Sequence, residues 1–445
     1  MAEKSLPAAD EDRLRAEYQL VACLEAGGFC SEAEPFARQI LAICEMTLGA
    51  EHPDTAASLS RLASLRASQG EYAGAKPLFE RALATCEKTL GAEHTNTVAI
   101  LGNLAGLLHA QADYAGAKPL FERALAINER TLGAEHPTTA TNLSNIASVL
   151  ESQGDYAGAK PLFERALAIN EKALGAEHPT TATSLGNLAS VLESQGDYAG
   201  AKPLFERALA IREKTLGAEH PDTAGSLNNL ASVLESQGDY AGAKPLFERA
   251  VAIREKTLGA EHPNTAASLS NLALLLKSQG DYAAAKPLFE RALAICEKTL
   301  GAEHPNTAAS LNNLAILLAS HGDHAGAKKL FERALAIGEK ALGAEHPGIA
   351  TNLSNIASLL VSQRDYAGAK LLFERALAIN EKALAAEHPD IATSLDNLAS
   401  VLDSQGDYAR AKPLFERALA IREKTLGAEH PDRAAPPPRG LKPLP

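Results

Sequence analysis

The chain has 445 residues, of which 46% are apolar and only 4% aromatic, and its formal net charge at pH 7 is −12. This acidic balance argues against nucleic acid as a partner, because binding to a phosphate backbone depends on neutralisation by Lys and Arg. The sequence has no apolar stretch of about 18 residues, as a membrane-spanning helix requires, and no basic run suited to an anionic membrane surface. Residues 1–13 lack the apolar core of a secretory signal, so we expect a cytoplasmic protein without membrane contact.

A repeat of 42 residues dominates the sequence. The tripeptide Glu-His-Pro occurs nine times in this repeat. The occurrences start at Glu51, Glu135, Glu177, Glu219, Glu261, Glu303, Glu345, Glu387 and Glu429. A further copy is marked by Glu93-His94-Thr95, and every interval is 42 residues or a multiple of it. Strict self-similarity at a period between 20 and 50 residues is typical of solenoids and propellers. The repeat therefore overrides the several globular domains that the length alone would suggest.

The two ends of the chain differ from the repeats. We expect residues 1–13 to be disordered and residues 14–427 to form one array of helix pairs. The first pair, residues 14–49, is degenerate, since Phe29 stands where most other copies have Asp, and terminal repeats are often atypical because they cap the stack. Residues 428–445 form a proline-rich tail that cannot be helical. We expect this tail to be disordered, with an extended polyproline segment as the alternative.

A single copy shows how the repeat is built. Apolar periodicity predicts two helices, at residues 181–194 and 198–216. Gly196 suits the left-handed position that ends the first helix, and Asp197 suits the N-cap of the second. Pro203, which has a counterpart in seven other copies, falls inside the second helix, where we expect it to kink the helix or delay its start.

Both helices carry apolar faces that an isolated pair could not bury. The stripe on the first helix consists of Leu185, Leu188, Ala189 and Leu192. The wider surface on the second consists of Tyr198, Ala201, Leu204, Phe205, Ala208, Leu209, Ile211 and Leu216. Neighbouring repeats must stack to bury these surfaces. The sequence therefore predicts an all-α fold, an α-solenoid.

This pattern resembles the tetratricopeptide repeat. The residues that carry the resemblance are Leu188, Ala189, Gly196, Tyr198, Ala201, Phe205 and Ala208. The 42-residue form, linked by Leu-Gly-Ala-Glu-His-Pro, is similar to the repeats of kinesin light chains and of long arrays attached to signalling proteins. The resemblance implies a right-handed superhelix of about ten antiparallel helix pairs. It also implies that the first helices line a concave groove that takes peptides.

The centre of the polar face of the first helix carries asparagine in eight copies. They are Asn103, Asn145, Asn187, Asn229, Asn271, Asn313, Asn355 and Asn397. Asparagine is a mediocre helix former, so its recurrence in mid-helix needs another reason. Each amide can donate to and accept from a peptide main chain, and we predict a ladder that holds an extended segment, as groove asparagines of the resembled family often do. The alternative is that each Asn bonds to a neighbouring repeat, or was copied by duplication without selection.

Small polar and acidic residues surround this ladder. The predicted contacts beside the asparagines are Ser190, Ser232, Glu193 and Glu235. The basic groove residues of kinesin light chains are missing, and a neutral or basic peptide segment suits the acidic side chains better. Leu274 and Ile316 make two adjacent copies more apolar than the rest. We predict a local hot spot there, with tighter packing as the alternative.

The sequence offers no constellation for catalysis, for a metal or for a cofactor. Ten of the thirteen histidines lie in the loops that link repeats, and equivalent loops should lie roughly 10 Å apart, too far to share a metal ion. We interpret these histidines as residues that fix the turn. A chain of near-copies has almost no unique residues from which to build a preorganised active site. We therefore expect no enzymatic activity.

Three cysteines share one position of the repeat: Cys44, Cys86 and Cys296. Other copies have Asn, Arg or Gly there. Because the position accepts such different residues, we expect it to face solvent. We expect these thiols to form neither a disulfide framework nor a metal site.

Three functions are compatible with these features. The leading hypothesis is a non-catalytic protein–protein interaction scaffold that binds an extended peptide segment in its concave groove. The second is a sensor array that works with a separate signalling enzyme or nucleotide-switch domain. The third is a cargo adaptor like kinesin light chain, which would need a coiled coil before the array. No feature predicts an oligomeric state.

Overall fold

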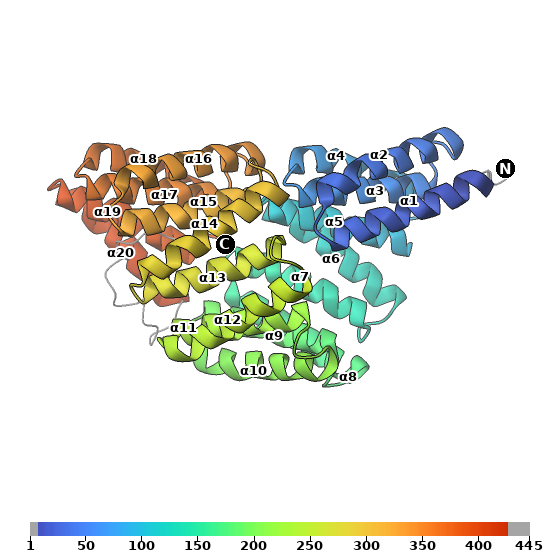
Figure 1. Ribbon diagram of the computed structural model, residues 1–445, viewed down its shortest axis with the longest axis horizontal. Helices are drawn as coiled ribbons and strands as arrows, with labels where there is room; N and C mark the ends of the chain where they lie inside the picture. The colour runs from blue at the N-terminus through green and yellow to red at the C-terminus, as the bar shows by residue number, and fades with distance from the viewer. Residues whose placement is uncertain (1–7, 426–445) are drawn as a thin grey trace. The chain divides into compact units, whose positions relative to one another are not determined.

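The computed structural model describes residues 8–425, in which the backbone forms twenty α-helices and no strand (Figure 1). The first helices of the pairs are α1 (Ala8–Ala26), α3 (Pro53–Ser68), α5 (Thr95–Ala110), α7 (Pro137–Ser152), α9 (Pro179–Ser194), α11 (Pro221–Ser236), α13 (Pro263–Ser278), α15 (Pro305–Ser320), α17 (Pro347–Ser362) and α19 (Pro389–Ser404). The second helices are α2 (Cys30–Thr47), α4 (Tyr72–Thr89), α6 (Tyr114–Thr131), α8 (Tyr156–Leu174), α10 (Tyr198–Thr215), α12 (Tyr240–Thr257), α14 (Tyr282–Thr299), α16 (His324–Leu342), α18 (Tyr366–Ala383) and α20 (Tyr408–Thr425). The all-α prediction and the pairing are confirmed.

The ends of the predicted array need one correction. Helix α1 begins at Ala8, inside the segment predicted to be disordered. Residues 8–13 read Ala-Ala-Asp-Glu-Asp-Arg, and this run extends the helix because alanine is a strong helix former and acidic residues suit a first turn. The proline-rich tail, residues 428–445, lies outside the described residues.

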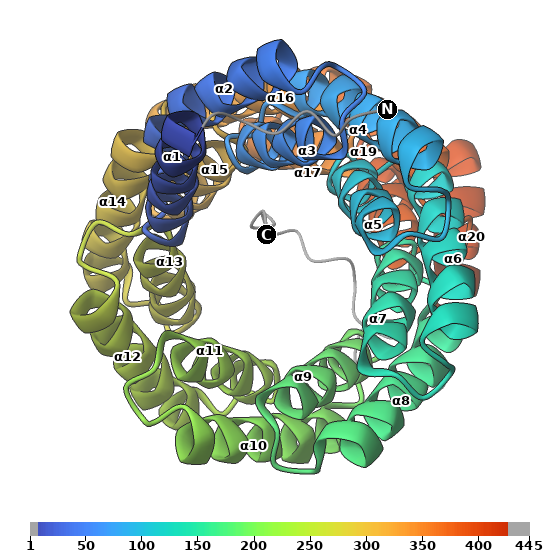
Figure 2. The same cartoon turned by 90° about the vertical axis from the view of Figure 1, so that its right-hand side faces the viewer.

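The helices group into two compact units, one up to Asn142 and one from Leu143, so that the boundary falls within α7. Within a unit, consecutive helices pack on one another, as α13 does on α12 and α14. Figure 2 shows α9, α11 and α13 along the inner side of the second unit's curve and α10, α12 and α14 along its outer side. In the first unit, α3 and α5 likewise lie inside α2, α4 and α6 (Figure 2). Each unit is therefore a solenoid of stacked helix pairs, whose right-handed sense stays a prediction.

The start of each first helix depends on the linking histidine. At α9, His178 is the N-cap, and its Nδ1 accepts a hydrogen bond from the backbone N–H of Thr180 at 3.1 Å. Pro179 follows at the first helical position, where its missing N–H costs nothing. The interpretation that the loop histidines fix the turn is confirmed. The side-chain nitrogen replaces the oxygen that Ser or Asp supplies in most caps.

The turn between the two helices also forms as predicted. Gly196 has a φ of +77°, the left-handed conformation that ends α9. Asp197 caps α10, because its Oδ1 accepts from the N–H of Gly200 at 2.9 Å. Helix α10 then runs from Tyr198 through Pro203, so the prediction of a late start is wrong. Proline has no backbone N–H, so the carbonyl of Ala199 receives no helical hydrogen bond from position 203. Ala199 is exposed, and water can satisfy that carbonyl.

The core lies between the inner and outer helices and continues from pair to pair. The predicted stripe of the first helix is buried, with Leu185 and Ala189 both 0% exposed. On the second helix, Ala201, Phe205, Ala208 and Ile211 are buried. One apolar cluster extends without a break from α9 to α15. A helix pair alone could not bury this surface, so the stacking follows from the width of the apolar faces.

Candidate functional site

The inner side of each unit is formed by the first helices, and we call this surface the groove face. It carries all eight predicted ladder asparagines, at one register of α5, α7, α9, α11, α13, α15, α17 and α19. Asn103 and Asn229 are exposed, whereas Asn313 and Asn355 are only 6% and 1% exposed. The remaining four, Asn145, Asn187, Asn271 and Asn397, are half-buried.

The ladder asparagines differ in how their amides are used. The Nδ2 group of Asn355 donates to Oδ1 of Asn312 at 2.9 Å, and that of Asn103 donates to Oγ of Ser60 at 3.4 Å. These two therefore bond to the preceding repeat, as the alternative interpretation expected. Within the described part of the chain, the following ladder amides make no hydrogen bond: Asn145, Asn187, Asn229, Asn271 and Asn397.

Acidic side chains of the groove face bond to serines of the next repeat. In α9, Oε1 of Glu193 accepts from Oγ of Ser232 at 3.2 Å and from Oγ of Ser236 at 3.4 Å. Glu151 receives the equivalent bonds from Ser190 and Ser194, and Glu235 receives one from Ser278. Burial raises the pKa of all three carboxyl groups above the usual glutamate value. The predicted contacts Ser190, Ser232, Glu193 and Glu235 thus form a bonded acidic flank beside the asparagines.

The two apolar candidates lie in different environments. Leu274 is half-buried on the groove face of α13. Ile316 is 0% exposed and packs in the core with Phe331 and Leu359. Ile316 presents no surface to a ligand, which corrects its assignment to the site. It occupies the same position of the repeat as Leu274, 42 residues earlier, but in this copy the side chain packs into the core.

A buried position between repeats was missed by sequence reasoning. We call the interface between a second helix and the first helix of the next pair a seam, and the residue shared by Cys44, Cys86 and Cys296 the seam position. All three cysteines are buried, which contradicts the expectation that they face solvent. In the repeat formed by α9 and α10 this position is Arg212, seven residues after the buried Phe205 and hence on the same helix face. That spacing was the signal for burial, and the variety of residues concealed it.

Arginine at the seam position fills the floor of the groove. From α10, Nη1 of Arg212 donates to Oγ of Ser226 at 2.9 Å and to the backbone oxygen of Asp222 at 3.2 Å, both in α11. Its Nη2 donates to Oγ1 of Thr183 in α9 at 3.1 Å. Arg254 is bound similarly, to Ser268 at 2.9 Å and to the backbone oxygen of Asn264 at 2.7 Å. A single guanidinium therefore joins consecutive helices behind the groove face.

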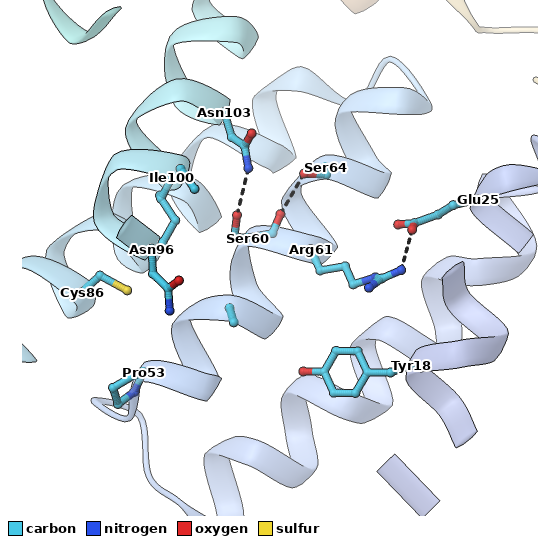
Figure 3. A pocket seen from close by; sticks show the side chains of 12 residues that line it. Tyr18, Glu25, Pro53, Ser60, Arg61, Ser64, Cys86, Asn96, Ile100 and Asn103 are labelled. Carbon is cyan, nitrogen blue, oxygen red and sulfur yellow. Dashed lines mark hydrogen bonds and ion pairs between the residues drawn. The ribbon is translucent and has the colours of Figure 1, made fainter. Parts of the chain in front are cut away.

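Cysteine at the seam position leaves the same place open. In the first unit, Cys86 lines a cavity of about 460 Å³ between α3 and α5, together with Asn96, Ile100 and Asn103 (Figure 3). Ile100 stands fourteen residues after Cys86, as Ser226 does after Arg212. The cavity therefore includes the place that the guanidinium of Arg212 takes at its own seam.

One wall of this cavity is charged. Arg61, which replaces the ladder asparagine in α3, donates through Nη2 to Oε2 of Glu25 at 2.6 Å (Figure 3). Its guanidinium carbon lies 5.8 Å from the centre of the Tyr18 ring, within the range of a cation–π contact. The degenerate first pair therefore ends the groove face of this unit with a paired cation.

The second unit has an equivalent cavity of about 460 Å³ between α13 and α15, lined by Cys296. Leu274, Asn271 and Asn313 are among its other lining residues. A third copy between α17 and α19, with Asn380 at the seam position, encloses only about 20 Å³. The Nδ2 group of Asn380 donates to Oγ of Ser394 at 3.0 Å and narrows the floor. Of these three cavities, the two with cysteine at the seam position are the larger.

The rest of the described surface offers little for chemistry. Residues 8–425 hold no cluster of three or more His, Cys, Asp or Glu side chains suited to a metal ion. No helix among them is both long and apolar enough to cross a bilayer. The five cysteines, all of them described, are free thiols.

Comparison with known proteins identifies the repeat. The family described as tetratricopeptide repeat matches ten overlapping segments that together span residues 12–435. A crystal structure of nearly identical TPR-like repeats, from a protein described as a kinesin light chain of Podosopora anserina, is 35% identical, and the match covers 46% of this chain and 98% of that one, with a TM-score of 0.39. BtubC from P. vanneervenii is 23% identical over 64% of this chain and 96% of its own, with a TM-score of 0.36.

A third solved structure is similar over nearly the whole chain. It is a Rap protein complexed with Competence and Sporulation Factor, 16% identical, and the match covers 93% of this chain and 98% of that one with a TM-score of 0.51. At this identity the likeness shows the fold alone. No curated protein matches the chain.

Proposed function

Because this chain belongs to the tetratricopeptide repeat family, we propose that it is a non-catalytic interaction scaffold that holds an extended peptide segment along its groove face. Proteins of this family mediate protein–protein interactions. The finer part of the proposal is the place and the mode of binding. The segment lies across the first helices, and the ladder amides bond to its main chain.

The observation that carries the proposal is a row of free amides. Asn145, Asn187, Asn229 and Asn271 occupy the same register of four consecutive first helices and bond to no other described residue. Each amide offers a donor and an acceptor to a ligand. Neighbouring helices pack about 10 Å apart and an extended chain rises about 3.3 Å per residue, so one amide meets roughly every third residue. Contacts at this spacing suit a main chain and place little demand on its side chains.

The charge of the groove face favours a neutral or basic segment. One flank of the free amides is acidic. It consists of Glu151, Glu193 and Glu235, each of which accepts a hydrogen bond from a serine of the next repeat. Lys277 is the basic exception, and burial lowers the pKa of its ammonium group. An acidic segment would meet like charge at three successive repeats, which costs affinity and slows association.

The proposal is tested by capture on an array of extended peptides of varied charge. The triple variant Asn187→Ala, Asn229→Ala, Asn271→Ala should lose capture, because it removes three consecutive amides. The matched control is Glu206→Ala, Glu248→Ala, Glu290→Ala, on exposed positions of the second helices. Both variants should keep the helical circular dichroism of the natural chain, since none of the six side chains is buried.

The two variants separate the groove face from the outer side. Loss of capture in the asparagine variant with full capture in the control supports the proposal. Equal capture by the asparagine variant and the natural chain would contradict it. Selection of acidic peptides by the natural chain would overturn the charge preference while leaving the ladder intact.

A further inference from the structure

The cavity at Cys296 is an uncharged pocket that opens on the groove face of the second unit. Its apolar walls are Pro263, Ala266, Ala267, Leu274 and Ala309, and its polar groups come from Ser270, Asn271, Asn306, Ser310, Asn313 and Cys296. No charged residue is among them. A charged ligand group would lose its hydration there without gaining a counter-ion, so the pocket selects against charge. Its volume of about 460 Å³ is in the range of sites that take small ligands.

One polar atom in this pocket lacks the partner that its burial demands. Asn313 is 6% exposed, and its Oδ1 accepts no hydrogen bond from any described residue. Buried side-chain oxygens in folded proteins are nearly always bonded. The hydroxyl of Ser310, nearby in the wall, is already directed to Sγ of Cys296 at 3.4 Å. The Oδ1 atom of Asn313 therefore marks a place for a donor that the described residues do not supply.

The opposite wall offers the complementary group. Asn271 lines the same pocket from α13, and its side chain bonds to no described residue. A carboxamide that enters between the two can donate an N–H to Oδ1 of Asn313 and accept from Nδ2 of Asn271. The methylene groups that carry this carboxamide would then lie against Leu274 and the alanines. A carboxylate fits the same shape but has no N–H, and it would bring a charge.

We propose that the Cys296 pocket is a specificity subsite of the groove, which takes an uncharged carboxamide side chain, glutamine or asparagine, of the bound segment. This inference rests on the proposed function, since the segment is what brings the side chain to the pocket. The seam residue sets where such a subsite exists. Arg212 and Arg254 fill the equivalent place at the two preceding seams, and Cys296 leaves it open.

The pocket can be tested without any peptide, because Cys296 provides a thiol at its floor. Two symmetric disulfides serve as probes, one of 3-mercaptopropanamide and one of its isostere 4-mercaptobutan-2-one. Both carry a carbonyl on the same stem, and only the first has an N–H donor. The natural chain is equilibrated with each probe in 2-mercaptoethanol, and peptide mapping gives the fraction labelled at each cysteine. Burial raises the pKa of the Cys296 thiol, so labelling is read at equilibrium and not as a rate.

We expect the carboxamide probe to label Cys296 about three to ten times more favourably than the ketone, as one added hydrogen bond to a buried acceptor implies. Cys86 is the internal control. Its cavity presents Asn103, which is exposed and so already hydrated, and the ratio there should stay close to one. Asn313→Leu should bring the Cys296 ratio down to one, whereas Asn313→Asp, which keeps an acceptor oxygen, should retain the preference.

Equal labelling of Cys296 by the two probes would overturn the proposal, and so would an absence of labelling by either. A ratio that survives Asn313→Leu would also contradict it, because the preference would then come from another group. These outcomes do not depend on peptide capture. Failure of the asparagine triple variant to lose capture would count against the groove, and failure of the probe ratio would count against the pocket.

Discussion

The seams at Arg254 and Cys296 are adjacent copies of one arrangement, and they differ in what occupies the floor of the groove. At the first, a guanidinium reaches Ser268 and the backbone of Asn264 and closes the floor. At the second, the serine and asparagine are still present as Ser310 and Asn306, and a cavity stands in place of the guanidinium. Between these two seams, one side chain on a second helix, behind the groove face, thus marks the difference between a closed floor and a pocket.

This difference shows how an array of near-copies can acquire selectivity. The groove face of such an array is repetitive and suits a main chain, which is also repetitive. Substitutions at the seam position change the floor in single repeats while leaving the backbone and the ladder in place. Each repeat is therefore a matched control for its neighbours, and the comparison can be sharpened or broken by exchanging residues between them.

The largest effect is expected where the seam arginine has an acidic partner. Arg422 pairs with Asp396 of the same helix pair, and their side chains are only 11% and 4% exposed. Asp396→Ala should destabilise this pair locally by about 3–5 kcal/mol, because it leaves a buried cation without its counter-ion. Hydrogen exchange of α19 and α20 measures the loss.

A double variant separates the charge from the packing. Asp396→Leu combined with Arg422→Met replaces the ion pair by apolar groups and should recover most of the protection, as buried pairs often allow. Unchanged exchange in Asp396→Ala would show that Arg422 is hydrated and that the two side chains are not buried against each other as the structure indicates.

The next effect comes from opening a filled seam. Arg254→Cys removes the bonds to Ser268 and to the backbone of Asn264, and should cost about 1–3 kcal/mol, the range for bonds to a charged group. The introduced thiol at position 254 should then be labelled by the disulfide probes, as Cys296 is. The reverse change, Cys296→Arg, should be tolerated, because Ser310 occupies the position at which Ser268 accepts a hydrogen bond from Arg254. Labelling of the thiol at 254 with no loss of stability would mean that the guanidinium contributes nothing to the seam.

A smaller effect is expected in the turn between the two helices of a pair. This turn needs a positive φ, which Gly280 adopts at +80° and Arg364 adopts at +64°. Arg364→Gly should stabilise its pair by about 1 kcal/mol, because a residue with a Cβ is strained in the left-handed region. The thermal midpoint and hydrogen exchange of α17 and α18 measure the gain. Loss of stability would show that the Arg364 side chain contributes more than its backbone strain costs.

The smallest effect concerns the acidic flank. Burial raises the folded pKa of Glu151, Glu193 and Glu235 above the ordinary value of 4.5, so their contribution to stability is favourable below that pH and is lost as pH rises through the folded pKa. The triple change to Gln should therefore raise the free energy of unfolding at pH 7 by less than about 1 kcal/mol in all, which is measured as a higher thermal midpoint. At pH 4, where the natural carboxyl groups are protonated, the two proteins should unfold alike. A gap that persists at pH 4 would assign the effect to packing instead.

The sequence was sufficient for most of the fold because the repeat is regular. Recurring punctuation, such as Gly196 and Asp197, predicted the boundaries of α9 and α10 to within two residues. The stripe around Leu185 predicted which face is buried. Of the two effects predicted for Pro203, a kink or a late start of the helix, the late start is wrong, because a proline on an exposed helix face loses a hydrogen bond that water can replace.

The site was harder to predict, because its character depends on differences between copies. The seam position was read as exposed from the variety of its residues, although its spacing from Phe205 indicated burial. Ile316 was assigned to the groove because it occupies the same position of the repeat as Leu274, yet Leu274 is half-buried and Ile316 is fully buried. The cavity at Cys296 depends on the absence of a side chain that other repeats supply, and only the packed structure shows what fills the space elsewhere.

The central claim is that the groove face binds the main chain of an extended segment, and backbone methylation tests it most directly. A fluorescent twelve-residue peptide chosen from the array is titrated against the full chain by anisotropy, beside a copy N-methylated at every third residue. We predict that methylation weakens binding by about tenfold or more. It removes backbone N–H groups of the peptide, which donate hydrogen bonds to the side-chain oxygens of the ladder asparagines. Alanine at the same positions, apart from the side chain at the Cys296 pocket, should change binding by less than about threefold. Full binding of the methylated copy together with loss of binding on alanine substitution would contradict the claim.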